Sequence, residues 1–284
     1  MSDSVLWRAL SGGPPITAVG VTWLSDEVRA VLPEGGGPGG LAAFAVGAGA
    51  QFVFVDAGAD HALQEARALR QHAIEPVWVV GGPLGSVAAE LGWDRVIRAS
   101  ASGFASLQTE IEEATRTALA RVAVGLRGGL RVHVIADDLA SDVGWLVDPA
   151  AVSVLMPHYR RLAGAVTGGG GRAIFHSDGD LRTVCPQLVR CGFVALHVGA
   201  VPSGSLRAVL RGVRTCGLIP AGGIPAAAAE TSVEELARLC AEVALEGAFV
   251  LCDDGGLMTS EQLTRVTEVQ RMVRTLAAEG PVPR

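Results

Sequence analysis

Residues 131–179 read RVHVIADDLASDVGWLVDPAAVSVLMPHYRRLAGAVTGGGGRAIFHSDG. The segment begins and ends with short apolar runs, 131–138 and 172–179, and has a helical pattern at 149–166 between them. Both runs are apolar throughout rather than alternating with polar residues, which is typical of strands buried on both faces. The order strand, helix, strand predicts two parallel strands joined by a helical crossover.

The same alternation continues along the whole chain. Nine runs are predicted strands: 16–23, 51–58, 76–82, 95–100, 131–138, 172–179, 193–200, 218–224 and 248–256. Five segments have helical periodicity: 61–73, 106–126, 149–166, 231–247 and 259–280. Residues 35–40 and 167–171 are glycine-rich and are predicted loops.

This pattern predicts a single-domain (β/α)8 TIM barrel over residues 1–284, with residues 1–15 as a loose N-terminal segment. Nine predicted strands exceed the eight of a barrel, so one of them is spurious or lies at an edge. A doubly wound open sheet is the alternative fold. The barrel is favoured because polar residues recur where predicted strands end, and these ends converge on one mouth in a barrel.

Helix starts are marked in three of the helical segments. Asp148 followed by Pro149 predicts an N-cap and a first helical residue. Thr231 and Ser232 precede Glu234 and Glu235 in a capping-box pattern, and Ser260 precedes Glu261 and Gln262 in the same way.

Composition excludes several function classes. The 284 residues carry 23 basic and 29 acidic side chains, for a net charge of −6, and every basic residue is Arg. Without Lys, neither Schiff-base chemistry nor a phosphate-binding P-loop is possible. The acidic balance and the lack of a basic run argue against nucleic acid as a partner.

The chain also lacks the marks of secretion and of membrane insertion. No apolar stretch is long enough to span a membrane, and residues 1–13 do not form a signal peptide. The five Cys are scattered, with no CxxC pair. A reduced, cytoplasmic protein is therefore expected.

The strongest chemical signal is the end of the run at 172–179. His176 and Asp178 are two residues apart, so they point to the same side of a strand, and Gly179 permits a turn. They suit either a general base oriented by a carboxylate or two ligands of one metal ion. The alternative is that Asp178 caps the following helix.

Adjacent carboxylates follow the run at 131–138. Asp137 and Asp138 point to opposite sides, and we expect Asp138 to face the mouth while Asp137 caps a helix or pairs with Arg. We expect catalysis from Asp138, His176 and Asp178. Substrate contacts are predicted for further residues at strand ends: Asp56, Asp137, Ser177, Asp180, His197, Gly222, Gly223, Asp253 and Asp254. Tyr159, the single Tyr, is expected to pack in a helix with its hydroxyl reaching solvent.

Seven segments between residues 134 and 272 occur in the order found in a known superfamily: ADDLASDVGWLVDP (136–149), PHYRRLAGAV (157–166), AIFHSDGD (173–180), CGFVALHVG (191–199), IPAGGI (219–224), TSVEELARLCAEV (231–243) and FVLCDDGG (249–256). Together they resemble the uroporphyrinogen decarboxylase superfamily, over about half of the chain. The resemblance implies a (β/α)8 barrel. It also implies either a decarboxylase or a methyltransferase that moves methyl groups between corrinoids, methyl donors and thiols.

Two departures from the family favour its methyltransferases. The decarboxylases carry an Arg-rich N-terminal motif, but residues 1–50 contain only Arg8 and Arg29, and their catalytic Tyr has no better match than Tyr159. The thiol methyltransferases bind zinc through His-x-Cys and a later Cys. Here His176 matches the His, Asp178 replaces the Cys, and Cys252 lies near the later position.

The resemblance therefore implies a zinc site formed by His176, Asp178 and Cys252, although a buried Cys252 is also a common core residue. It implies methyl transfer between a small-molecule donor or thiol and a corrinoid (cobalamin) carried by a partner protein, with Asp138 orienting the substrate. A homodimer is also implied. The alternatives are a decarboxylase of uroporphyrinogen or another carboxylated substrate, and a non-catalytic barrel that binds a corrinoid or tetrapyrrole.

Overall fold

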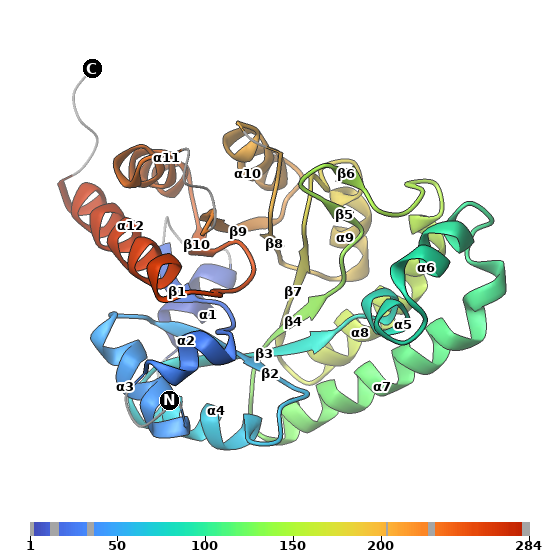
Figure 1. The fold of residues 1–284 in the computed structure, drawn as a ribbon, viewed down its shortest axis with the longest axis horizontal. Helices are drawn as coiled ribbons and strands as arrows, with labels where there is room; N and C mark the ends of the chain where they lie inside the picture. Colours follow the sequence, from blue (N-terminus) through green and yellow to red (C-terminus); the bar gives the residue numbers. More distant parts are fainter. Residues whose placement is uncertain (1–2, 12–16, 33–36, 203, 227–230, 280–284) are drawn as a thin grey trace. The chain divides into compact units, whose positions relative to one another are not determined.

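A computed structural model describes residues 3–11, 17–32, 37–202, 204–226 and 231–279. Eight of the described strands form a closed barrel in the order β1-β10-β9-β8-β7-β4-β3-β2 (Figure 1), and the pairings within it are parallel. Their bounds are β1 Thr17–Val21, β2 Phe52–Asp56, β3 Glu75–Gly81, β4 Val132–Ala136, β7 Arg172–Ser177, β8 Ala195–Val198, β9 Ile219–Ile224 and β10 Phe249–Asp253. The predicted (β/α)8 barrel is confirmed, and closure of the sheet excludes the open alternative.

The chain divides into two compact units. The first comprises Met1–Val55, Ala59–Pro76 and Ile219–Arg284, and the second comprises Asp56–Gly58 and Val77–Leu218. The first unit contains β1, β2, β9 and β10 with the helices α1 Val5–Leu10, α2 Asp26–Ala30, α3 Pro38–Gly47, α4 Ala62–Gln71, α11 Val233–Leu245 and α12 Ser260–Glu279.

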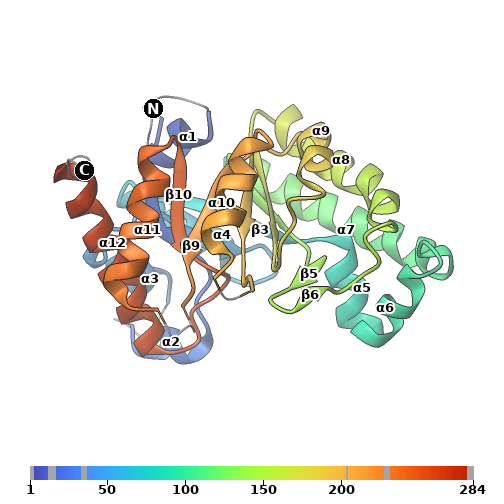
Figure 2. The ribbon, with the colours of Figure 1, turned by 90° about the horizontal axis from the view of Figure 1, so that it is seen from above.

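In the first unit, α11 and α12 lie side by side (Figures 1 and 2) and α1 packs against β1 and β10. Helix α1 lies in the segment predicted to be loose. The Ser4 hydroxyl accepts the Trp7 N–H at its start, and Leu6, Ala9 and Leu10 are buried. Apolar burial and a cap therefore order this part of the N-terminus. The remainder of the predicted loose segment, residues 1–2 and 12–15, lies outside the described residues.

The second unit contains β4, β7, β8 and most of β3. Its other elements are α5 Pro83–Leu91, α6 Trp93–Ser100, the 3₁₀ turn Ala105–Leu107, α7 Gln108–Arg127, the hairpin strands β5 Ala140–Ser141 and β6 Gly144–Trp145, α8 Val152–Gly168, α9 Cys185–Cys191 and α10 Leu206–Thr215. Helices α7 and α8 lie against each other (Figures 1 and 2). The ring of Tyr159 from α8 meets Phe175 of β7 edge-on, with ring centroids 5.0 Å apart.

The strand predicted at 95–100 is wrong, because these residues belong to helix α6. Val96, Ala99 and Ser100 are buried, whereas Arg95 and Arg98 are exposed. Buried residues three and four apart follow the period of a helix, and the β-branched pair at 96–97 had suggested a strand. The other eight predicted strands correspond to the eight strands of the barrel.

The predicted helix starts hold to different degrees. Ser232 and Glu235 form the expected capping box. At the last helix the reciprocal bonds form one residue earlier than predicted, between Thr259 and Gln262. Helix α8 begins at Val152 rather than at 149, because the Asp148 carboxylate accepts the Ala150 N–H and closes a turn before the helix.

The glycine-rich segments contain more helix than predicted. Helix α3 begins at Pro38, inside the loop expected at 35–40, with Gly37 as its N-cap. Proline suits the first helical position because its missing N–H has no intrahelical partner there. Helix α8 likewise runs to Gly168, into the loop expected at 167–171. Within the described ranges, no helix combines the length and the apolarity that crossing a membrane requires.

Candidate metal centre

Three neighbouring strands of the second unit bring the strongest predicted site residues together. Asp138 follows the end of β4, His176 lies near the end of β7 and Asp178 follows it, and His197 lies in β8. In the strand register Ala136 is opposite His176, and His176 is opposite His197. The site therefore lies where parallel strands end, which is where TIM barrels carry their active sites.

Asp138, His176 and Asp178 form a group that could hold a metal ion. Their ligand atoms all lie within 4.8 Å of one another, and the His176 Nε2 is 3.7 Å from the Asp138 Oδ1. That separation is too long for a hydrogen bond. Ligand atoms about 2.1 Å from a shared divalent ion lie about 3 to 4 Å from each other, so this separation suits a metal site.

His197 affects both the orientation and the charge of His176. The His176 Nδ1 lies 2.7 Å from the His197 Nδ1, and both side chains are buried. One nitrogen of this pair must donate and the other must accept, so at least one ring is neutral. Burial lowers the pKa of His176 well below its usual range, and the charge of a protonated His197 would lower it further. His176 is therefore a neutral imidazole, the form that binds metals.

Backbone bonds hold the two carboxylates in place. The Asp178 N–H donates to the Asp138 Oδ1 at 3.0 Å, and the Ala200 N–H donates to the Asp178 Oδ1 at 2.9 Å. The alternative considered for Asp178 was that it caps the following helix. Its carboxylate accepts instead the N–H of Ala200, which lies in the segment between β8 and α10 and does not begin a helix. The Ser177 hydroxyl donates to the Asp178 carbonyl and accepts the Leu139 N–H, so it ties the two strand ends together.

Burial raises the pKa of the Asp138 carboxyl, although the Asp178 N–H stabilises its charged form. The Asp138 side chain is nonetheless 40% exposed, so it is accessible to a ligand. A cation bound between Asp138 and His176 would favour the ionised carboxylate.

Asp137 has a different environment from its neighbour. It is 1% exposed, and its carboxylate accepts the N–H groups of Leu84 and Gly85 at the start of α5 and the hydroxyl of Tyr159 at 2.8 Å. Burial raises the pKa of Asp137 to about 7, against the effect of these donors. A Cβ on Gly82 would lie 2.4 Å from the Asp137 Cγ, so glycine is required there.

Asp137 therefore caps α5, which is one of the two roles considered from the sequence. A contact between Asp137 and a substrate stays a prediction, and the burial of this side chain makes it less favourable. The Tyr159 side chain is fully buried, so its hydroxyl bonds Asp137 and does not reach solvent as predicted.

Two further predicted contact residues of this unit accept hydrogen bonds from residues two positions further along the chain. The Asp180 carboxylate accepts the Arg182 guanidinium at 2.6 Å, and this hydrogen bond lowers the pKa of Asp180. Asp56 is exposed at the end of β2 and accepts the Gly58 N–H. Their substrate contacts remain predictions.

The first unit carries the other predicted residues. Asp253 is buried at the end of β10 and accepts the N–H and the hydroxyl of Thr22 and the N–H of Gly256. Asp254 accepts the Ala226 N–H at 3.1 Å, and burial raises its pKa. These bonds give both carboxylates a part in holding the loops after β9 and β10.

Cys252 is fully buried in β10, and burial raises the pKa of its thiol well above its usual range. A cysteine binds zinc as its thiolate, so this environment disfavours Cys252 as a ligand. Among the described residues, the metal-binding group contains no cysteine. Gly222 and Gly223 lie inside β9 rather than after a strand, with positive φ of 107° and 98° that glycine tolerates.

Several partners in these clusters were not predicted. Tyr159 donates to Asp137 and Thr22 donates to Asp253, and the missing side chain of Gly82 leaves room for Asp137. These residues lie on other elements than the carboxylates, and no spacing pattern in the sequence connects them. A single tyrosine in an apolar helix was the only available signal.

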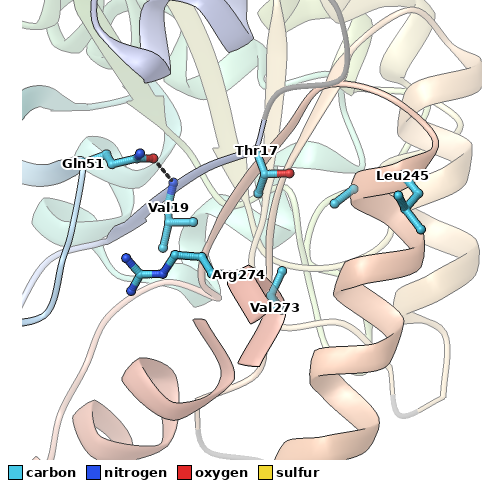
Figure 3. A pocket seen from close by; sticks show the side chains of 7 residues that line it. Thr17, Val19, Gln51, Leu245, Val273 and Arg274 are labelled. Atoms are coloured by element: carbon cyan, nitrogen blue, oxygen red, sulfur yellow. Dashed lines mark hydrogen bonds between the residues drawn. The ribbon is translucent and has the colours of Figure 1, made fainter. Parts of the chain in front are cut away.

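A cavity of about 430 Å³ lies in the first unit (Figure 3). It is lined by Thr17, Val19, Gln51, Ala244, Leu245, Val273 and Arg274. None of these belongs to the candidate metal centre or to the predicted contact residues.

Comparisons with known proteins identify the fold. No family model and no curated protein matches the chain, so membership in the uroporphyrinogen decarboxylase superfamily stays a prediction. A methyltransferase from Methanosarcina mazei has a similar structure, with a TM-score of 0.71 and 18% identity over 96% of this chain and 99% of that one.

Two other barrels have lower TM-scores. D-Psicose 3-epimerase from Clostridium cellulolyticum H10, solved with D-tagatose, has a TM-score of 0.57 at 10% identity, covering 92% of this chain and 99% of that one. A xylose isomerase-like TIM barrel protein from Mycobacterium smegmatis, in complex with magnesium, has a TM-score of 0.55 at 12% identity, covering 92% and 97%. These similarities, at 10 to 18% identity, show that the chain has the fold of these barrels.

Proposed function

We propose that this protein is a metal-dependent methyltransferase, which moves a methyl group between a small donor or thiol and a corrinoid carried by a partner protein. The observation that carries the proposal is the convergence of Asp138, His176 and Asp178 where β4 and β7 end. The methyltransferase barrel has a TM-score of 0.71, above the 0.57 of the epimerase barrel, and this analogy of fold supports the methyltransferase class.

Each residue has a distinct task in this proposal. Asp138 and Asp178 supply carboxylate oxygens, and His176 supplies its Nε2. His197 orients the His176 ring through the Nδ1 contact at 2.7 Å, as partners of metal-binding histidines commonly do. A bound divalent ion would act as a Lewis acid on the heteroatom of the substrate.

The donor set indicates which substrates fit best. Two carboxylates and one imidazole form a harder site than one built from thiolates. Zinc remains acceptable, because zinc binds Asp and His. We infer that the site polarises an oxygen- or nitrogen-bound methyl group more readily than it activates a thiol.

Metal analysis and a methyl-transfer assay test the proposal together. We expect protein purified without chelator to hold about one divalent ion per chain, and Asp138→Asn, His176→Gln and Asp178→Asn to lose it. Methylation of reduced cobalamin, followed by its visible spectrum, should fall in the same three variants. Asp94→Asn is the matched control, because Asp94 is an exposed aspartate of helix α6 that lies outside the metal-binding group and the predicted contact residues.

A folded protein that transfers methyl groups at full rate without metal would contradict the metal's role. Tight cobalamin binding that is unaffected by His176→Gln, without turnover, would indicate a binding protein instead of an enzyme. Co-purification and sedimentation test the corrinoid partner and the homodimer, which belong to the same proposal.

A second candidate is an epimerase or isomerase of a small hydroxylated substrate. The carboxylate-rich ligand set suits magnesium or manganese, and the similar barrel from Mycobacterium smegmatis is a magnesium complex. Incorporation of deuterium from solvent into a sugar substrate, with no methyl transfer, would favour this candidate.

A further inference from the structure

The cavity lies where two of the barrel strands begin. Thr17 begins β1, and Gln51 directly precedes β2, so the cavity lies at the amino ends of these two strands. Barrel active sites lie at the opposite ends of the strands. At about 430 Å³ it falls within the usual range for small-molecule sites, about 300 to 1,000 Å³.

The lining residues differ in their exposure. Val19, Ala244 and Val273 are 2%, 6% and 1% exposed and close the base of the cavity, whereas Leu245 is 49% exposed and Arg274 is also exposed. The accessible lining therefore combines an apolar side chain with a cation. A ligand with an aliphatic tail and a charged head matches this combination.

Arg274 is held in place by the end of helix α3. Its guanidinium donates to the carbonyls of Ala48 and Gly49 at 3.2 and 3.1 Å. Gly49 has a positive φ of 65°, and a Cβ there would lie 2.6 Å from the Arg274 Nη1. Because a guanidinium has five N–H donors, these two bonds leave others for a ligand.

Gln51 adds a second oriented donor. Its side-chain oxygen accepts the Val19 N–H at 2.9 Å (Figure 3), which turns the amide so that its NH₂ is the group left for a ligand. Among the described residues that line the cavity, none is acidic. The polar part of the lining thus offers hydrogen-bond donors and a positive charge, which together favour an anion.

We propose that this cavity is a second binding site, for a small carboxylate with an aliphatic tail. The tail lies on Leu245, and the carboxylate binds Arg274 and Gln51 beside it. The site is independent of the candidate metal centre and of the proposed reaction.

Calorimetric titration of the full chain with octanoate tests the site. We expect binding with a Kd below about 1 mM. Octanol lacks the charge and acetate lacks the tail, so each should bind at least about 10-fold more weakly. Equal binding of octanol and octanoate would overturn the anionic head group, and no heat with octanoate would overturn the site.

Two substitutions test whether octanoate binds in this cavity. Arg274→Gln removes the charge, and Leu245→Glu places a carboxylate at the exposed rim, where it leaves the buried part intact. Each should weaken octanoate binding by about 10-fold or more. Arg271→Gln is the matched control, an exposed arginine of the same helix that does not line the cavity. Unchanged affinity in both rim variants would contradict the proposed site.

Discussion

His133 lies in β4 and is completely buried, and its two ring nitrogens have different environments. Its Nε2 donates to the Leu130 carbonyl at 3.0 Å. Its Nδ1 is also buried and has no hydrogen-bond partner in the described part of the chain. Protonation would add a charge and an unsatisfied N–H to this apolar position. Burial accordingly lowers the pKa of His133 to about 4.

The lowered pKa makes the stability of the fold depend on pH. In the unfolded chain a histidine has its ordinary pKa of about 6.5. Between pH 6.5 and about 4 the unfolded chain therefore binds more protons at this position than the folded chain does. The free energy of unfolding falls as pH falls through this window. The difference of about 2.5 pKa units corresponds to a loss of about 3 kcal/mol.

Urea unfolding at several pH values between about 4 and about 7 measures this loss. We expect His133→Gln, which keeps an N–H donor near Leu130 but cannot be protonated, to remove it. The difference in unfolding free energy between the unmodified protein and the variant should then change by about 3 kcal/mol across the window.

His72→Gln is the control, because it makes the same substitution at an exposed histidine. Effects of other titrating groups, such as His176, cancel in the comparison. A difference between the unmodified protein and His133→Gln that stays constant with pH would refute the reasoning.

Four other changes test particular contacts by chemical unfolding or calorimetry. Tyr159→Phe removes the hydroxyl that Asp137 accepts and should cost about 1 to 3 kcal/mol of stability. Gly82→Ala forces a Cβ against Asp137 and should cost at least about 1 kcal/mol. Asp253→Ala leaves the buried donors of Thr22 and the part-buried N–H of Gly256 without their acceptor, for a loss of about 2 kcal/mol or more. Zinc at about 100 times its Kd should stabilise the protein by about 2.7 kcal/mol, and His176→Gln should abolish this gain.

The barrel was predictable because its strands have a strong and repeated signal. Each runs through the interior as a short apolar segment, and helical segments separate them. The one wrong strand, 95–100, shows the limit of this reasoning, since its Val and Ile belong to an amphipathic helix. Short helices such as α2 and α9 were not predicted, because five to seven residues hold too little periodicity.

The site was predictable to the extent that it depends on strand ends. His176 and Asp178 share one side of one strand end, and Asp138 follows the neighbouring strand, so topology alone brings them together. The partners that orient them come from elsewhere: His197 from β8 and the Ala200 N–H after it. Their registers depend on how strands align, which composition and spacing do not determine.

The adjacent pair Asp137 and Asp138 shows why identical residues acquire different chemistry. Both follow the same strand, but opposite side-chain directions place Asp137 on the N–H groups at the start of α5 and Asp138 beside His176. The first is enclosed and satisfied by three donors, so it anchors a helix to the barrel. This anchor fixes the backbone from which Asp138 projects. Because three hydrogen bonds hold Asp137, the adjacent Asp138, which is proposed to bind metal, has less freedom to move.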